Sequence, residues 1–581
     1  MKSVLKGLLV VIVVVTGTIF WLVTPEKPPS KQAFINAQVL TMDATNNIAQ
    51  AVLVENARIV HVGSDDEVQA LIDNDTIVHD LGGRTLMPGF VDAHGHFPGS
   101  GLGAIAADVS SPPVGNTTTV EELQSRLKQQ AEKTAAGEWV MGFGYDDTLL
   151  AGQKHPTRQQ LDAVSTEHPV YIMHVSGHMG VANSVALEII GYDKSTPNPV
   201  GGLIVKDSAG ELTGLLEETA HEPFVTASLN MSLPDFYTLL TTAVDEYASM
   251  GVTTAQSGGV DMTMLKGLYT AQRLGLIPFR LELWPFEDKM GDAIRAGEVD
   301  LSEFNSDKVR TKTIKIVADG SIQGFTGYLS HPYHSPFRDD EQYRGYPTVP
   351  REKLVELVDH YHSNGYQLAI HGNGDASIDD IIYAFDLAQQ KHPVEDPRMI
   401  LIHSQMARDD QLVDMKRLGI TPSFFSAHTY YWGDRHRDIF MGPERAMRMS
   451  PTRSAKDIGL RYSVHLDTPV VPMTPMLMVW STANRLSSNG NVIGADQRVS
   501  VLDALRAVTI DAAWQVFRDK DLGSIESGKL ADLIVLDGDP LLDPLALRDL
   551  SVDKTFVGGV NIFSRTQAPK TADQVVSTQA N

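Results

Sequence analysis

The middle of this chain alternates short apolar runs with longer segments of helical periodicity, and this alternation restricts the fold more than any other feature. Consecutive strands that are separated by a helix run parallel, because the helix carries the chain back to the edge where the next strand starts. Eight strand candidates of this kind predict an α/β protein with a TIM-like (β/α)8 barrel. They are Thr85–Phe90, Thr253–Ser257, Phe279–Leu283, Thr313–Val317, Gln367–Ile370, Met399–Ile402, Pro422–Phe425 and Tyr462–Val464.

A strand-like alternation of β-branched and polar side chains also fills the stretch before this region and the stretch after it. Because the two ends of a domain often lie close together, we expect residues 32–84 and 516–565 to form one small β-sandwich. The barrel then spans residues 85–515. A long gap follows its first strand, and we expect an inserted lobe there at about residues 98–252.

The first 23 residues contain an uninterrupted apolar run, which Lys2 and Lys6 precede. Its length is near the lower limit of the ~17–25 residues that span a bilayer, and a basic flank stays in the cytoplasm. We therefore expect residues 1–31 to be a membrane anchor or signal segment with a linker, and the rest of the chain to lie in the periplasm or outside the cell. Secretion after signal cleavage is the alternative. The polar residues 566–581 are expected to form a disordered tail.

The composition excludes several kinds of function. Asp and Glu number 72 against 48 Lys and Arg, and the net charge of −24 argues against nucleic-acid partners, which require clustered positive charge. The 581 residues include no cysteine, so disulfides, thiolate ligands and thiol catalysis are excluded. Any metal must be bound by histidine, carboxylate or a modified side chain. No glycine-rich nucleotide-binding motif is found, so no organic cofactor is expected.

Two histidines separated by one residue follow the first strand candidate, in the sequence GFVDAHGH. In an extended segment, residues i and i+2 point to the same side, so His94 and His96 can face the barrel axis and bind one metal ion. Gly95 leaves space between the two rings.

Later strand candidates also end in potential metal ligands. His371 ends the fifth, His403 ends the sixth, and Asp467 follows the eighth. All lie at the carboxyl ends of the strands, where barrel active sites are built. His465 is an alternative to Asp467, but a carboxylate can both bind metal and accept a proton, so we favour Asp467.

This order of ligands resembles that of the metal-dependent amidohydrolase superfamily, and residues 504–537 resemble the junction between barrel and sandwich in that superfamily. The chain is most similar to the YtcJ-like branch, the amidohydrolase 3 group, over about residues 32–563. The closer likeness lies in residues 142–146, 155–158, 176–178 with Asn183, 315–321, and 428–434.

The resemblance implies a lysine that bridges two metal ions after the fourth strand, and Lys315 occupies that position. A charged lysine in an apolar strand is costly, and its carbamylation by carbon dioxide would make it a carboxylate ligand. Asp319 is an alternative metal ligand, or a residue that contacts a ligand without contacting the metal.

The loops and the insertion are expected to contact the substrate. His178 and Asn183 are candidates by the resemblance. Tyr145, in a glycine-rich loop with Asp146, could line a pocket. His428 and Trp432 belong to an aromatic segment after the seventh strand, and we expect this segment to form an apolar wall.

These observations predict a metal-dependent hydrolase of carbon–nitrogen bonds other than peptide bonds, acting on a small amide or an N-substituted formamide. One or two divalent ions, with zinc expected, would activate water, and Asp467 and Lys315 are the predicted catalytic residues. A deaminase or an ester or lactone hydrolase on the same metal site is the enzymatic alternative, and a non-catalytic metal-binding surface protein is the other. The expected partners are a small-molecule substrate and, through the N-terminal segment, a membrane. Homodimerisation is left open.

Overall fold

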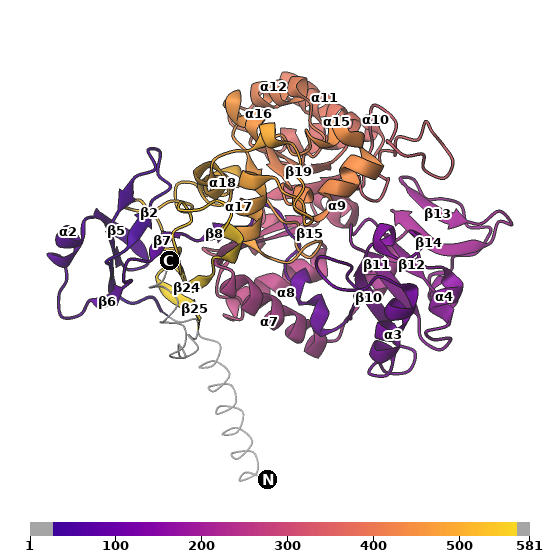
Figure 1. The fold of residues 1–581 in the computed structure, drawn as a ribbon, viewed down its shortest axis with the longest axis horizontal. Coiled ribbons are helices and arrows are strands. Elements are labelled where there is room, and N and C mark those ends of the chain that lie inside the picture. Colours follow the sequence, from indigo (N-terminus) through magenta and orange to yellow (C-terminus); the bar gives the residue numbers. More distant parts are fainter. Residues whose placement is uncertain (1–26, 566–581) are drawn as a thin grey trace, which may run out of the picture.

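The computed structural model describes residues 27–565. A region of parallel strands forms the centre of the molecule in Figure 1. A unit of β-strands from both ends of the described chain lies on its left, and the inserted lobe lies on its right. Among the helices described, none is both long and apolar enough to cross a membrane. The predicted anchor or signal in residues 1–26 and the predicted tail at 566–581 lie outside the described residues.

The central strands follow one another in sequence order, each paired in parallel with the next, in two sheets. The α/β TIM-like architecture expected from the alternation is therefore present. One sheet contains β8 (Phe90–Val91), β15 (Val252–Val260), β16 (Arg280–Pro285) and β17 (Val309–Arg310). The other contains β18 (Thr313–Val317), β19 (Gln367–Gly372), β20 (Met399–His403), β21 (Ile420–Phe424) and β22 (Ser463–Val464).

The two sheets continue into one another at Phe286, which bridges to Lys315 in β18. Within residues 27–565 no strand ladder joins β22 to β8, so the predicted closed ring is not completed by strand pairing. The buried side chain of Gln515 spans this seam instead. It accepts a hydrogen bond from Ser463 Oγ (2.5 Å) and donates one to Ala93 O (2.6 Å).

Helices cover the outside of the central strands, and their apolar faces share one core with them. The N-terminal ends of several helices are capped by Ser or Asp side chains, as at Ser232 and Asp261, which satisfies free backbone N–H groups. The helices are α7 (Leu233–Ser249), α8 (Met262–Arg273), α9 (Glu287–Arg295), α10 (Arg351–Ser363), α11 (Asp375–Lys391), α12 (Asp409–Leu418), α16 (Thr452–Asp457), α17 (Pro475–Asn484), α18 (Val501–Ala507) and α19 (Ile510–Gln515).

Both ends of the chain contribute to a unit of two sheets around a shared core. One sheet contains only early strands: β5 (Arg58–Gly63), β4 (Ala51–Glu55), β1 (Lys31–Ile35) and β6 (Ile77–Asp80). The other combines β25 (Val560–Ser564), β24 (Val552–Val557) and β23 (Leu533–Leu536) with β7 (Thr85–Pro88), β2 (Gln38–Leu40) and β3 (Ile48–Ala49). Strand β23 pairs antiparallel with β7, which joins the two chain ends.

The first barrel strand differs from the prediction. Residues Thr85–Pro88 form β7 in the sheet of the chain ends, and only Phe90–Val91 pair with β15. The chain changes sheets at Gly89, next to a proline that has no N–H for a ladder. The whole run is buried on both sides of this point, so its apolar pattern could not reveal the break.

The inserted lobe lies between β8 and β15 and contains its own six-stranded sheet. In spatial order the strands are β13 (Gly202–Lys206), β14 (Leu212–Glu218), β12 (Met179–Ala182), β11 (Val170–His174), β10 (Val140–Tyr145) and β9 (Ala107–Asp108). The lobe's helices are α3 (Val120–Ala131), α4 (Arg158–Asp162), α5 (Ser184–Ile190) and α6 (Glu222–Ser228). Helix α7, which the predicted insertion included, packs in the core of the central strands through Leu240, Ala243 and Tyr247.

Candidate metal centre

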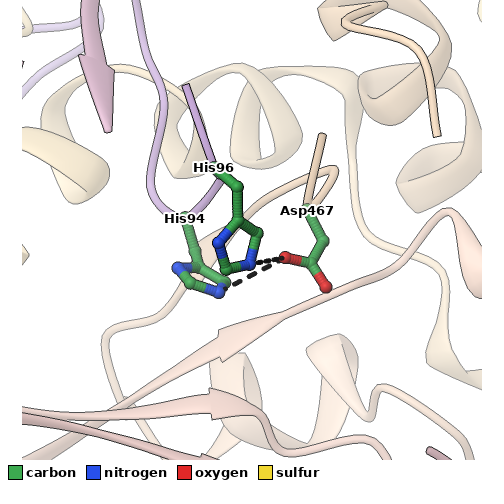
Figure 2. Close-up of side chains that lie close together, drawn as sticks. All are labelled: His94, His96 and Asp467. Carbon is green, nitrogen blue, oxygen red and sulfur yellow. Dashed lines mark ion pairs between the residues drawn. The ribbon is translucent and has the colours of Figure 1, made fainter. Parts of the chain in front are cut away.

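The carboxyl ends of the central strands bring the six predicted metal ligands into one cluster. His94 and His96 follow β8, and Asp467 follows β22. Figure 2 shows both imidazoles directed at the Asp467 carboxylate. Asp467 Oδ1 lies 3.3 Å from His94 Nε2 and 3.2 Å from His96 Nε2.

The other predicted ligands surround this group. His403 Nε2 lies 3.7 Å from Asp467 Oδ2, and the rings of His403 and His371 are 4.5 Å apart between centroids. Lys315 is 2% exposed, and its Nζ lies 3.2 Å from His94 Nε2. His96 is the accessible member, with 44% of its side chain exposed.

Each buried histidine of the cluster has a polar contact at Nδ1 that fixes the orientation of its ring. Gln256 Oε1 accepts the N–H of Gly95 and lies 3.0 Å from His94 Nδ1. An amide oxygen only accepts, so His94 donates from Nδ1 and its Nε2 carries the lone pair. Trp284 stacks on the same ring at 5.6 Å.

His371 and His403 follow the same arrangement. His371 Nδ1 lies 3.1 Å from Asp319 Oδ1, and three backbone N–H groups fix that carboxylate. His403 Nδ1 lies 3.0 Å from His465 Nε2, and Ser423 contacts the other nitrogen of His465. Asp319 and His465, which we considered as alternative ligands, contact His371 and His403 at Nδ1 and so orient these predicted ligands.

The backbone is strained at two cluster positions. His403 and Asp467 have φ angles of 68° and 58°, a region that costs non-glycine residues of order 1–3 kcal/mol. Asp tolerates this conformation better than most residues. The surrounding contacts maintain both conformations and aim the side chains inward, as is common at functional sites.

The electrostatics suit metal ligation. Burial holds the pKa values of His94, His371 and His403 well below the usual value, so these rings are neutral, as ligands must be. Burial also lowers the pKa of Lys315 to about 7, although Asp467 opposes this shift. Burial opposes the charge of Asp467, but the facing ring of His96 outweighs burial and holds the pKa of Asp467 well below the usual value.

The donor set also fits a divalent ion geometrically. Asp467 Oδ1 is buried and has no hydrogen-bond partner in the described part of the chain, although two imidazole nitrogens lie within 3.3 Å of it. An unpaired buried carboxylate oxygen is costly. A cation between the carboxylate and the imidazoles would satisfy it, and imidazole with carboxylate suits zinc and its neighbours.

His178 reaches this cluster from the inserted lobe. Its ring lies 4.9 Å from that of His371, and its Nδ1 lies 2.8 Å from Glu218 Oε2. Glu218 is 4% exposed and has a φ of 51°. Sequence reasoning missed Glu218 because it is one carboxylate in a strand distant from His178, and only the pairing of β12 with β14 brings them together.

Two predicted substrate contacts do not join the cluster. Asn183 caps α5, where its oxygen accepts from Val170 N and Ala186 N and its nitrogen donates to two carbonyls, so its amide has no free group. Tyr145 is completely buried in the lobe, and its hydroxyl lies 3.1 Å from His155 Nδ1. Adjacent residues of a strand face opposite sides, and Asp146 is the one that faces the central strands.

A cavity of about 200 Å³ lies between the lobe and the central strands. Trp432 lines it, as does Thr468, directly after Asp467. Asp146 of the lobe accepts hydrogen bonds from Trp432 Nε1 and from Arg435, which also line the cavity. His428 is buried between Phe425 and Trp432 and does not line this cavity. Trp432 thus fits the predicted apolar wall, whereas His428 lies outside the cavity lining, with its ring centroid 6.4 Å from that of His403.

The amidohydrolase family model, the one for the amidohydrolase 3 group, matches residues 78–563. The chain belongs to the amidohydrolase family. It is 31% identical to an N-substituted formamide deformylase of Arthrobacter pascens over 546 residues, which cover 92% of this chain and 98% of the relative. It is 28% identical to the putative amidohydrolase YtcJ of Bacillus subtilis over 545 residues, covering 91% and 98%.

A solved structure supports the fold of this amidohydrolase. An uncharacterized metal-dependent hydrolase from Pyrococcus horikoshii superposes with a TM-score of 0.71 at 24% identity, covering 89% of this chain and 99% of that one. The family and the donor set together establish a metal-dependent hydrolase of carbon–nitrogen bonds.

Proposed function

We propose that this amidohydrolase cleaves a small N-substituted formamide or a similar amide, releasing a carboxylate and an amine. The observation that carries this proposal is the 31% identity to a formamide deformylase across nearly the whole of both chains. The cavity beside the cluster supports it, because it has Trp432, Phe143 and Pro469 in its lining and suits an apolar substituent.

We assign the metal ligands to six side chains: His94, His96, Lys315, His371, His403 and Asp467. Zinc is the expected ion, in one or two copies, because imidazole and carboxylate ligands suit it. When bound, a divalent ion polarises a carbonyl oxygen and lowers the pKa of water.

The protein's own groups then orient the substrate and move protons. Asp467 Oδ1 accepts the proton of the attacking water and delivers it to the leaving nitrogen, which makes a poor leaving group viable. His178, held at Nδ1 by Glu218, presents Nε2 to the substrate. Trp432 forms one wall of the cavity and excludes water from the reacting bond.

Lys315 is proposed to act as a carbamate. Its Nζ would add to the carbon of carbon dioxide and lose one proton, giving an anionic ligand. The site around Lys315 supports this assignment, because its buried amine faces the imidazole of His94 and makes no salt bridge within residues 27–565.

A substrate panel tests the reaction class. The metal-reconstituted full chain is incubated with N-substituted formamides, other amides, amino-substituted rings, esters and lactones. We expect formate and amine in equal amounts from the first group. Ammonia from the rings alone would indicate a deaminase instead, and turnover of esters or lactones alone would indicate those hydrolases. Stoichiometric metal without any turnover would indicate a metal-binding surface protein.

Asp467→Asn tests the proton shuttle. Asn also tolerates the positive φ of this position, so the change removes the charge and leaves the backbone undisturbed. We expect kcat to fall by about 10²–10⁴-fold, while His94, His96, His371 and His403 retain metal. Steady-state kinetics and metal analysis check this. Full activity in the metal-loaded variant would show that another group moves the proton.

We also propose that residues 1–31 attach the protein to a membrane, with the hydrolase on the non-cytoplasmic side. The apolar run and its basic flank support this. Fractionation of cells that express the full chain should place it in the membrane fraction. Recovery in the soluble periplasmic or secreted fraction, shortened at the N-terminus, would support a cleaved signal instead.

A further inference from the structure

A second group of histidines and carboxylates lies within the inserted lobe. His174 ends β11, Asp147 begins the short helix η2 (Asp147–Leu149), and His155 lies in the loop before α4. His174 Nε2 is 3.1 Å from Asp147 Oδ1, and His155 Nε2 is 3.6 Å from Asp147 Oδ2. The two rings therefore face the two oxygens of one carboxylate.

The separation of His174 Nε2 from Asp147 Oδ1 is close to that of neighbouring ligands around one ion. Tetrahedral zinc with bonds of about 2.0–2.1 Å places neighbouring ligand atoms about 3.3 Å apart, whereas charged hydrogen bonds are about 2.7–2.9 Å long. The distances from His94 and His96 to Asp467, 3.3 and 3.2 Å, fall in the same range. The distance from His174 to Asp147 is thus similar to those at the candidate metal centre, and His155 faces the other carboxylate oxygen at a longer distance.

The buried nitrogen of His174 gives an independent indication. His174 is 1% exposed, and its Nε2 has no hydrogen-bond partner among residues 27–565. Asp147 Oδ1 lies 3.1 Å from this nitrogen. An unpaired buried nitrogen is costly, and an ion between the ring and the carboxylate would satisfy both.

The supporting contacts are also those of metal-binding histidines. Tyr145 fixes His155 at Nδ1 (3.1 Å), and Ser176 Oγ contacts His174 Nδ1 (2.9 Å). Nε2 of each ring is thereby left for the carboxylate side. The backbone N–H of Ser176 also lies 3.2 Å from His174 Nδ1. In the competing arrangement, that N–H donates to Nδ1 and the proton on Nε2 faces Asp147, without metal.

The neighbouring Asp146 does not serve as a ligand. Its carboxylate accepts two hydrogen bonds from Thr148 and one each from Trp432 and Arg435. These occupy its four lone-pair positions. His155, Asp147 and His174 remain as the three available donors, and His155 and Asp147 are accessible enough for an ion to enter.

We propose that His155, Asp147 and His174 form a second metal site in this protein, separate from the hydrolytic centre, which binds a first-row divalent ion such as zinc. Imidazole and carboxylate are suitable ligands for such ions. The ion links the end of β11 with η2 and the loop before α4. Its role is to hold the lobe rigid beside the cavity.

Anomalous diffraction at the zinc edge tests the site directly in the wild-type full chain. Crystals grown with zinc should show a peak between Asp147, His155 and His174 as well as one at His94 and Asp467. A peak at the hydrolytic centre with none in the lobe would overturn the second site and leave the proposed function untouched.

Metal analysis of variants gives a second test. After dialysis against zinc, His174→Gln and Asp147→Asn should each contain one equivalent per chain less than wild type. His168→Gln should lose none, because this lobe histidine is buried and bonds only to Glu138 O through its side chain. Equal zinc in wild type and in both cluster variants, with all proteins shown to be folded by circular dichroism, would contradict the proposal.

Discussion

Three histidines of the candidate metal centre are held in position by side chains that are not themselves predicted metal ligands. Gln256 fixes His94, Asp319 fixes His371, and His465 fixes His403. Each partner sets which ring nitrogen carries the proton and so determines whether Nε2 can be a ligand. The chemistry of the cluster therefore depends as much on these second contacts as on the ligands.

Most of the cluster could be predicted from the sequence because its histidines and Asp467 lie at or just beyond the carboxyl ends of apolar strands, whereas Lys315, within β18, was expected from the family resemblance. His94 and His96 also share the i, i+2 spacing that places two side chains on one side. Gln256 and Glu218 could not be found in this way, because each contacts a histidine that is distant in the chain. The sequence also could not show that the Asn183 side chain caps α5, because helix capping and substrate binding use the same side-chain groups.

Gly258→Ala tests the close approach of β15 to the ligand His94. A Cβ at this position would overlap the His94 ring at Cε1 and Nδ1, which displaces the ring from Gln256. We expect metal content and kcat/KM to fall by at least about tenfold, corresponding to about 1.4 kcal/mol. Metal analysis and kinetics of the folded variant check this.

Gly103→Ala is the matched control. Its added Cβ would lie 3.9 Å from Phe143 Cζ, an ordinary contact, so its metal content should equal that of wild type. Wild-type metal content in Gly258→Ala would mean that β15 does not determine the position of His94.

The elements of the central region were largely predictable, because helical and strand periodicities alternate clearly there. The seam was not. Strand β22 contains two residues, and Gln515 from α19 replaces the missing ladder with side-chain hydrogen bonds. Whether side-chain hydrogen bonds can take the place of a strand ladder depends on the distance between two strand ends, and no local sequence pattern encodes that distance.

Asp146, directly after β10, makes one of the contacts between the inserted lobe and the central region. This carboxylate contacts Trp432 and Arg435 beyond β21 and so fixes one side of the cavity. Asp146→Asn removes the charge that pairs with Arg435. We expect KM to rise by about tenfold, the effect of about 1.4 kcal/mol, with kcat nearly unchanged, because the proton-transferring groups are intact. Steady-state kinetics check this, and a fall in kcat alone at wild-type KM would contradict it.

The overall fold could be predicted from the order of strand and helix patterns along the sequence. The contacts between the central region and the unit of the chain ends could not be predicted in this way. Arg280 at the start of β16 and Asp532 before β23 form a buried pair, with N–O distances of 2.7 and 3.0 Å. The pair joins the central strands to the unit of the chain ends. Neither residue stands out in the sequence, because Arg and Asp of this kind are abundant on protein surfaces.

Asp532→Asn tests this connection. The change leaves the guanidinium of Arg280 buried without its counter-charge, which costs about 3–5 kcal/mol. We expect the free energy of unfolding to fall by that amount in denaturant titrations. Asp359→Asn breaks the exposed pair with Lys391 and should cost less than about 1 kcal/mol. Equal effects of the two changes would contradict a special role for the buried pair.

The contacts between the two ends of the described chain have a consequence for synthesis on the ribosome. Gln32 donates a hydrogen bond to Gly559 O, 527 positions later in the chain. At about 5–20 residues per second, translation takes roughly 25–100 s to reach that partner. Until β23 has been synthesised, the edge of β7 that pairs with it remains unpaired. This sheet can therefore be completed only after the last strands have been synthesised.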